Sequence, residues 1–164
     1  MRDDEIALTD QSKMDAPLMT ASTIDVLFSD SGKIQAHLTS PLLKKYVGDN
    51  EYTEFPDGFH LFIFDSALRP STSITGNYGK NRDAARIMEA RGNVVVRNLL
   101  KNKQLETECL IWDENKRLIY SEGKVKITEP AKILYGDGIQ ANESFTWYQI
   151  TNPTGQMMVK QDSL

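Results

Sequence analysis

Gly92-Asn93-Val94-Val95-Val96 returns 31 residues later (123 − 92 = 31) as Gly123-Lys124-Val125-Lys126-Ile127, and Ile74 maps to Leu105 at the same shift. Each copy contains a strand pattern, a polar turn, a second strand and then a glycine that precedes a third strand. A fixed period of about 20–50 residues is typical of stacked supersecondary units. Such units share one continuous core, because none of them buries its own apolar face. The repeat, which also relates Arg86 to Arg117, therefore predicts an elongated β structure.

Alternating apolar and polar residues extend the β pattern over most of the chain. Near its start, Ile24, Val26 and Phe28 alternate with polar residues, and a turn at 30–32 joins them to a second alternating run at 33–38. Two such runs around a glycine turn predict a hairpin. Further strands are expected at 59–64, 71–76, 86–90, 94–96, 105–112, 118–121, 125–128, 133–141, 145–150 and 156–159. No segment has a helical period long enough to compete, so the chain is predicted to be all-β.

One short segment leaves two alternatives open. Residues 41–46 follow Ser40, and a serine followed by Pro41 fits the first turn of a helix. The segment is shorter than the helices that hold by themselves in water, and it can equally continue the preceding strand. Helix and strand both remain open for residues 41–46.

Length and composition fit a single domain. The chain has 164 residues, a formal net charge of −4 and one cysteine. At this length about 70% of the unfolded surface can be buried, so a metal or disulfide is not needed for stability. A weakly acidic chain lacks the clustered basic face of nucleic-acid-binding proteins. We expect a flexible N-terminal lead at 1–20, downstream of a removed anchor or signal, a β domain at 21–160 and a polar tail at 161–164.

The repeated segment also predicts which side chains face inward. Val125 and Ile127 lie on one side of their strand, and two lysines lie on the other. Because unpaired lysines rarely lie in a core, the valine and isoleucine are expected to face inward. Along 105–111 the odd positions face inward by the same argument, opposite two glutamates. The predicted inward set is Ile34, Ala36, Leu38, Ile74, Val94, Val96, Leu105, Cys109, Ile111, Val125 and Ile127. Ordinary core packing is the simplest role for such residues.

Residue types that carry catalysis or bind metals are sparse. His37 and His60 are the only histidines, and neither has a cysteine, histidine or aspartate nearby at ligand spacing. We therefore expect no metal site. Cys109, the only thiol, is predicted to be a buried structural residue. The sequence has no nucleophile-elbow, Walker or dinucleotide-binding motif, so we expect no catalytic residue, no cofactor and no enzymatic activity.

Several segments follow one another in an order that is found in a known family. They are the hairpin at 25–38, the strand Tyr52-Thr53-Glu54-Phe55-Pro56, the segment Ile74-Thr75-Gly76-Asn77 and the strands at 86–96. In this order they resemble the LptC family, a periplasmic component of the lipopolysaccharide export bridge. The repeated unit resembles the one that this family shares with OstA-like proteins. The resemblance covers about residues 22 to 150, most of the chain.

The resemblance implies a fold, a role and a location. Members of this family are open, elongated β-jellyrolls that stack edge to edge between an inner-membrane ABC transporter and a soluble, periplasmic LptA-like bridge protein. Their apolar interior takes the acyl chains of lipopolysaccharide, so the predicted inward set becomes a lipid-binding set. The resemblance also implies a periplasmic domain that an N-terminal anchor attaches to the inner membrane. Whether that anchor is a transmembrane helix or a lipid stays open.

Open ends of a stacked sheet have unpaired backbone groups, and these groups recruit another chain by strand addition. The first and last predicted strands are the natural docking strands. Their residues are Ile24, Val26, Phe28, Met157 and Val159.

Two other functions compete with lipid transport. A cell-surface β-sandwich for ligand binding or adhesion would have a packed core and would use aromatic loop residues such as Trp147 and Tyr148. A β-helix enzyme acting on polysaccharide would need two or three carboxylates clustered on one exposed sheet, and the sequence shows no such cluster. A fluorescent acyl probe separates the lipid carrier from the packed sandwich, because only a groove binds it.

Overall fold

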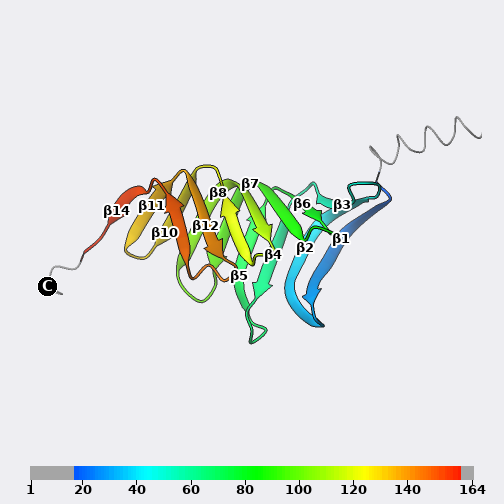
Figure 1. Cartoon of the computed structure of the whole chain (residues 1–164), viewed down its shortest axis with the longest axis horizontal. Coiled ribbons are helices and arrows are strands. Elements are labelled where there is room, and N and C mark those ends of the chain that lie inside the picture. Colours follow the sequence, from blue (N-terminus) through cyan, green and yellow to red (C-terminus); the bar gives the residue numbers. More distant parts are fainter. Residues whose placement is uncertain (1–16, 160–164) are drawn as a thin grey trace, which may run out of the picture.

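The protein is an elongated stack of antiparallel strands (Figure 1). The computed structural model describes residues 17–159, and within this range all regular secondary structure is β, in one 14-stranded sheet. The strands are β1 (Met19–Asp30), β2 (Lys33–Tyr46), β3 (Tyr52–Phe55), β4 (Phe59–Phe64), β5 (Pro70–Gly76), β6 (Tyr78–Arg82), β7 (Ile87–Asn98), β8 (Lys103–Asp113), β9 (Leu118–Ser121), β10 (Val125–Glu129), β11 (Lys132–Gly136), β12 (Gly138–Asn142), β13 (Tyr148–Thr151) and β14 (Thr154–Met157). The predicted fold class, an elongated all-β jellyroll, is confirmed.

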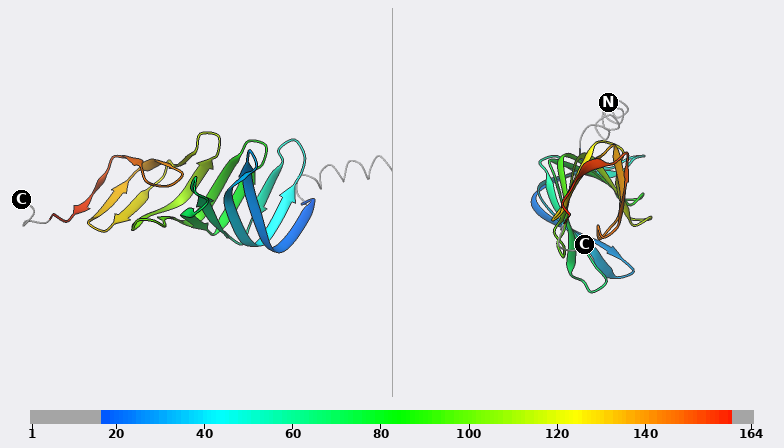
Figure 2. Two further views of the ribbon diagram at one scale, coloured as in Figure 1. Left: turned by 90° about the horizontal axis from the view of Figure 1, so that it is seen from below. Right: turned by 90° about the vertical axis from the view of Figure 1, so that its left-hand side faces the viewer.

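The sheet folds over into two half-sheets that enclose one apolar core. Half-sheet A has the order β1-β2-β4-β5-β7-β8-β10-β11-β14, and half-sheet B has the order β2-β3-β6-β7-β8-β9-β12-β13. The long strands β2, β7 and β8 contribute one end to each half-sheet, and β1 also runs from one to the other, because it pairs with β2 along its whole length. Seen end-on, the strands wind around a common axis (Figure 2). The interior therefore lies between two walls that belong to one continuous sheet.

The chain passes from one half-sheet to the other along a shared line, which we call the crease. In β7 the crease is a bulge at Gly92 and Asn93, whose φ angles of 78° and 48° are left-handed. Asn77 separates β5 from β6 and donates its backbone N–H to the carbonyl of Gly92 at 2.9 Å. Asp137 separates β11 from β12 in the same way and donates to the carbonyl of Thr151 at 2.9 Å. The prediction of one strand over 133–141 is therefore wrong, because the crease divides it into two.

The 31-residue repeat is visible in the turns of the fold. Arg86 and Arg117, which the repeat relates, have nearly equal left-handed φ angles of 57° and 56°. Ile74 and Leu105, also related by the repeat, are both buried in the core. A non-glycine residue rarely adopts a positive φ, so this agreement shows that the repeated sequence encodes a repeated conformation.

Residues 41–46 form a strand, which settles the open alternative. They complete β2, and Pro41 has no register partner at the point where Thr23 of β1 adopts a left-handed φ of 53°. Pro41 lacks an N–H and cannot donate to the ladder, and the register with β1 continues unshifted on both sides of it. Ser40 Oγ donates to the carbonyl of Gly58 at 2.7 Å, which ties β2 to the turn that precedes β4.

The sheet begins two residues before the expected start of the β domain at residue 21. β1 begins at Met19, so the last two residues of the predicted lead belong to the sheet. The rest of that lead up to residue 16, and the predicted tail at 161–164, lie outside the described residues. The last strand is Thr154–Met157 rather than 156–159.

Candidate functional site

A continuous row of apolar side chains crosses half-sheet A. The strand register aligns one inward residue from each of eight neighbouring strands. This apolar row consists of Val26, Leu38, Leu61, Ile74, Val96, Leu105, Ile127 and Leu134. The inner members are at most 2% exposed, whereas Val26 and Leu134 at its two ends are only partly buried. The apolar row therefore spans the domain and approaches the solvent at both ends.

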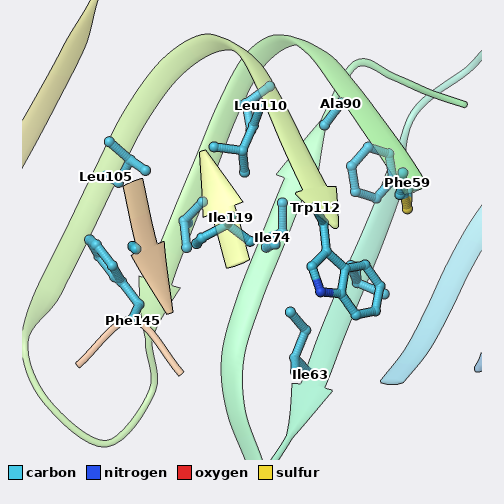
Figure 3. Packing of buried hydrophobic residues seen from close by; sticks show 14 of the residues in the cluster. Phe59, Ile63, Ile74, Ala90, Leu105, Leu110, Trp112, Ile119 and Phe145 are labelled. Carbon is cyan, nitrogen blue, oxygen red and sulfur yellow. The ribbon is translucent and has the colours of Figure 1, made fainter. Parts of the chain in front are cut away.

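Half-sheet B supplies the opposite wall of the interior. Figure 3 shows Leu110, Trp112 and Ile119 pointing into the same space as Ile63 and Ile74 of half-sheet A. All five side chains are at most 3% exposed. In this structure the interior is a core that apolar side chains from both walls fill.

Most of the predicted inward set lies in this core. Eight of its residues are at most 3% exposed: Ala36, Leu38, Ile74, Val94, Val96, Leu105, Val125 and Ile127. Their inward orientation is thus confirmed, while their contact with lipid stays a prediction. Ile34 is different, because it lies near the start of β2 and is 41% exposed. The expectation that it is buried in the interior is wrong, because it lines a cavity open to solvent, together with residues 142–144, instead of packing in the core.

The prediction that Cys109 and Ile111 face inward is wrong. Cys109 is exposed and Ile111 is only partly buried. The reason is the bulge at the crease, where two residues of β7 stand opposite one residue of β8. Opposite this bulge two successive residues of β8, Glu108 and Cys109, are exposed, so the alternation shifts by one and the inward residues beyond Thr107 are Leu110 and Trp112.

The side of the domain opposite the crease, which we call the open side, is where turns of the two half-sheets meet. Arg86 Nη2 lies 3.7 Å from Asp30 Oδ2 and 3.4 Å from Glu114 Oε1, so it joins the end of β1 to the turn after β8. At the C-terminal end, the Tyr148 hydroxyl donates to Glu129 Oε2, which joins β13 to β10. Polar contacts therefore close the interior along a line where, in residues 17–159, no backbone pairing joins the two half-sheets.

The loop between β12 and β13 crosses the open side and closes the middle of it. We call residues 142–147 the strap. Thr72 Oγ1 of half-sheet A donates to the carbonyl of Glu143 at 2.7 Å, and Asn98 Nδ2 donates to the carbonyl of Phe145 at 3.2 Å. The Phe145 side chain is 0% exposed and points into the interior beside Leu105 (Figure 3). The strap therefore contributes an aromatic side chain to the core.

Two carboxyl groups near the strap have altered acidity. Burial raises the pKa of Glu143, although Trp112 Nε1 donates a hydrogen bond to its Oε2 at 2.8 Å and favours the charged form. Burial also raises the pKa of Glu114, against the attraction of Arg86. Both carboxyls therefore take up a proton more readily than exposed glutamates do.

Within residues 17–159, the outermost strands leave backbone groups free at both ends of the stack. In this range β1 pairs only with β2, and β14 pairs only with β11. Ile24, Val26 and Phe28 of β1 pack partly against the core, whereas Met157 and Val159 are 65% and 60% exposed. The two predicted docking strands are thus edge strands, and docking itself stays a prediction. A cavity of about 670 Å³ lies beside the C-terminal edge, lined by residues of β10, β11 and β14 and the connections next to them.

A model of one protein family, described as "Lipopolysaccharide-assembly, LptC-related", matches residues 3–146, most of the chain. The chain belongs to the LptC family. Its general role is therefore in lipopolysaccharide transport, as the resemblance in its sequence indicated. Comparison with curated proteins gives no match.

LptC-family proteins are periplasmic and anchored to the inner membrane. In residues 17–159 of this member, no helix is long and apolar enough to cross a membrane. Within the same described range, no group of three or more histidine, cysteine, aspartate or glutamate side chains is placed to hold a metal ion.

Sequence reasoning missed several residues of the LptC interior. The inward orientation of Leu110 and Trp112 was not predicted, because the alternation of β8 shifts by one residue opposite the bulge. The Gly92-Asn93 pair gave a signal, because glycine next to asparagine favours the left-handed conformations that a bulge requires. Phe145 was read as part of a strand, and nothing local shows that it enters the core from a loop.

Proposed function

We propose that this LptC domain is a non-enzymatic carrier that holds the acyl chains of lipopolysaccharide in its interior and passes the lipid between partners. The donor is an inner-membrane ABC transporter, and the acceptor is a periplasmic LptA-like bridge protein. An N-terminal anchor keeps the domain at the inner membrane. The observation that carries the proposal is the apolar row, which is continuous over eight strands and approaches the solvent at both ends.

The energetics of an acyl chain suit this interior. Moving a methylene group from water into an apolar site is favourable by about 0.8 kcal/mol. The interior is filled by its own side chains, so an acyl chain has to displace some of them or part the half-sheets. The polyanionic head groups stay in water, since the chain itself has a net charge of −4.

Strand addition at the two edges accounts for docking. The free N–H and C=O groups of β1 and β14 can pair with a strand of a partner. Such pairing would extend the sheet, and it would bring the apolar row of one domain next to the interior of the next. Lipid would then pass along the stack without leaving an apolar surface.

A photoreactive amino acid tests whether lipid enters the interior. It would replace Leu134 in one variant and Tyr135 in another, and each protein would be irradiated with purified lipopolysaccharide. These neighbours lie on opposite faces of β11: Leu134 packs against the core, whereas Tyr135 is 47% exposed. Carriage in the interior predicts an adduct at position 134 and none at 135.

The other outcomes are equally informative. A folded protein that gives no adduct at either position would contradict carriage and would favour a surface-binding module with a packed core. An adduct only at position 135 would place the lipid outside the fold.

A further inference from the structure

Two polar side chains interrupt the inner face of half-sheet A beside the apolar row. Thr72 is 0% exposed and Asn98 is 5% exposed, and the two are register partners on β5 and β7. The residues next to them in the row, Ile74 and Val96, are apolar. Buried donors are costly unless an acceptor meets them, so this place in the interior requires an acceptor. In this structure the strap supplies it.

The side-chain amide of Asn98 has a fixed orientation. Its Oδ1 accepts the backbone N–H groups of Leu100 and Lys101, each at 2.9 Å. Its Nδ2 therefore points toward the strap, where it donates to the carbonyls of Ser144 at 3.1 Å and Phe145 at 3.2 Å. Together with the Thr72 hydroxyl, the amide forms a pair of donors that faces carbonyl oxygens.

The strap is held in shape by its own hydrogen bonds. Asn142 Oδ1 accepts the backbone N–H of Thr146 at 3.0 Å and that of Trp147 at 2.8 Å. The N–H of Phe145 donates to the carbonyl of Asn142 at 2.9 Å. These bonds do not involve half-sheet A. The strap therefore keeps its shape through bonds of its own, and three side chains attach it to half-sheet A: Thr72, Asn98 and Lys103, whose Nζ lies 3.4 Å from the Thr146 carbonyl.

Phe145 fills space next to the apolar row under backbone constraint. Its φ of 53° is left-handed, a conformation that side chains other than glycine rarely adopt. Its ring packs 5.8 Å from the ring of Tyr148, and Lys103 Nζ lies 5.8 Å from its centroid. Phe145 therefore fills the core from a loop rather than from the regular sheet.

We propose that the strap is a gate on the open side and that it stands in for an acylated ligand. The Phe145 ring occupies the place of an acyl chain, and the strap carbonyls occupy the place of the ester or amide carbonyl that links the chain to its sugar. When the strap moves away, Thr72 and Asn98 donate to that carbonyl while the chain lies along the apolar row. This inference rests on the proposed function, and it adds a lateral opening and recognition of the acyl linkage.

Two probes of equal chain length test recognition of the linkage. One is a fluorescent dodecanoyl ester, and the other is the matching dodecyl ether, which lacks the carbonyl. The native protein should prefer the ester, and Thr72→Val should reduce that preference about two- to tenfold, the range expected for one hydrogen bond. The ratio of the two affinities cancels any general effect of the substitution on the strap.

Thr107→Val is the matched control. Thr107 is also a buried inward threonine, but its hydroxyl bonds to Ser121 Oγ and to the carbonyl of Lys124, away from the strap. The Thr107→Val variant should therefore keep the same preference for the ester as the native protein. Equal ester preference in the native protein and in Thr72→Val would overturn recognition of the linkage, as would an equal loss in both variants.

Spin labels measure whether the strap moves. In a Cys109→Ala background, labels at Thr146→Cys on the strap and Arg97→Cys on the outer face of β7 report the strap distance. Labels at Arg97→Cys and Lys126→Cys, both on half-sheet A, give a reference distance. Adding lipopolysaccharide should lengthen the first distance and leave the second unchanged.

The outcomes separate this gate from the carrier function. An adduct at position 134 with an unchanged strap distance would overturn the gate and leave the carrier intact. Absence of any adduct at that position would overturn the carrier, whatever the strap does.

Discussion

The thiol of Cys109 reports the side-chain reversal that the bulge in β7 imposes on β8. Cys109 is exposed, while its neighbour Leu110 is 2% exposed. We expect a maleimide to label Cys109 in the native protein, with a rate that increases with pH, because partial burial raises the pKa of this thiol and the thiolate is the nucleophile. The variant Cys109→Ala/Leu110→Cys moves the thiol inward and should resist labelling until the protein is unfolded. Protection of native Cys109 would contradict the bulge.

The buried carboxyl of Glu143 makes stability depend on pH. Burial raises its pKa in the folded state above the ordinary value of 4.5, so the folded protein binds this proton more tightly than the unfolded chain does. Stability from this group is therefore greatest below about pH 4.5, and is lost as the pH rises through the higher folded pKa. Glu143→Gln keeps an acceptor for Trp112 and removes the charge, so it should stabilise the protein by about 1 kcal/mol or less at pH 7. Thermal unfolding at pH 5 and pH 7 measures this.

Glu122→Gln is the control for this pH effect. It removes the same charge from an exposed turn between β9 and β10, where burial is absent. It should change the melting temperature little at either pH. A gain at pH 7 that is equal in both variants would mean that the overall net charge, rather than the burial of Glu143, determines the effect.

Inward-facing residues were predictable wherever alternation is regular. Val125 and Ile127 alternate with Lys124 and Lys126, the repeat carries the assignment to Val94 and Val96, and all four are buried. Cys109 failed because one extra residue on the neighbouring strand changes its side, and that residue lies outside the segment being read. Alternation is a local signal, whereas a bulge is a property of two paired strands.

At the level of single strands, the outward backbone groups of β14 determine whether another chain can extend the stack. Met158 donates its N–H to the carbonyl of Ala131 at 2.6 Å, so by alternation the N–H of Gln156 also faces β11 and that of Met157 faces outward. Met157→Pro removes an outward donor and should weaken docking of a purified LptA-like bridge protein by about tenfold, which corresponds to about 1.4 kcal/mol. Titration of the two proteins measures this loss. The free energy of unfolding should change by less than about 0.5 kcal/mol.

Gln156→Pro is the companion variant. It removes a bond between β14 and β11 and keeps the outward donor, so it should loosen the last strand, which faster amide hydrogen exchange in β14 would show. If Met157→Pro docks as well as the native protein, β14 is not the docking strand.

Elements were easier to predict than their connections. The hairpin of β1 and β2 follows directly from two alternating runs and a glycine turn. The strap could not be predicted, because its position depends on Thr72 and Asn98, which are far away in the sequence and bind its carbonyls only after the sheet has folded over. A loop of ordinary polar composition carries no sign that its one phenylalanine will be buried.

At the scale of the whole molecule, the repeat explains why the apolar row is continuous. Each repeat places an equivalent side chain at the same register, so Ile74 and Leu105 lie in one row although they belong to different units. The crease allows the other half of the same strands to cover this row. Each strand added to the stack therefore lengthens the continuous apolar surface, which is what transport of a long lipid chain requires.

Release of lipid along the apolar row should be separable from uptake of lipid into the interior. Leu134→Glu places a charge at the partly exposed end of the row near β14, where the side chain can still reach solvent, so we expect a stability cost of about 0.5–3 kcal/mol and a folded protein. Because the interior upstream is unchanged, the variant should still take up a fluorescent acyl probe but should release it to a purified LptA-like acceptor more slowly. Tyr135→Glu puts the same charge on the outer face, where Tyr135 is 47% exposed, and should change neither uptake of the probe nor its release to the acceptor. Resonance energy transfer between the probe and a labelled acceptor protein measures how fast the lipid is passed on. Equal rates for the two variants would mean that lipid does not leave along the apolar row.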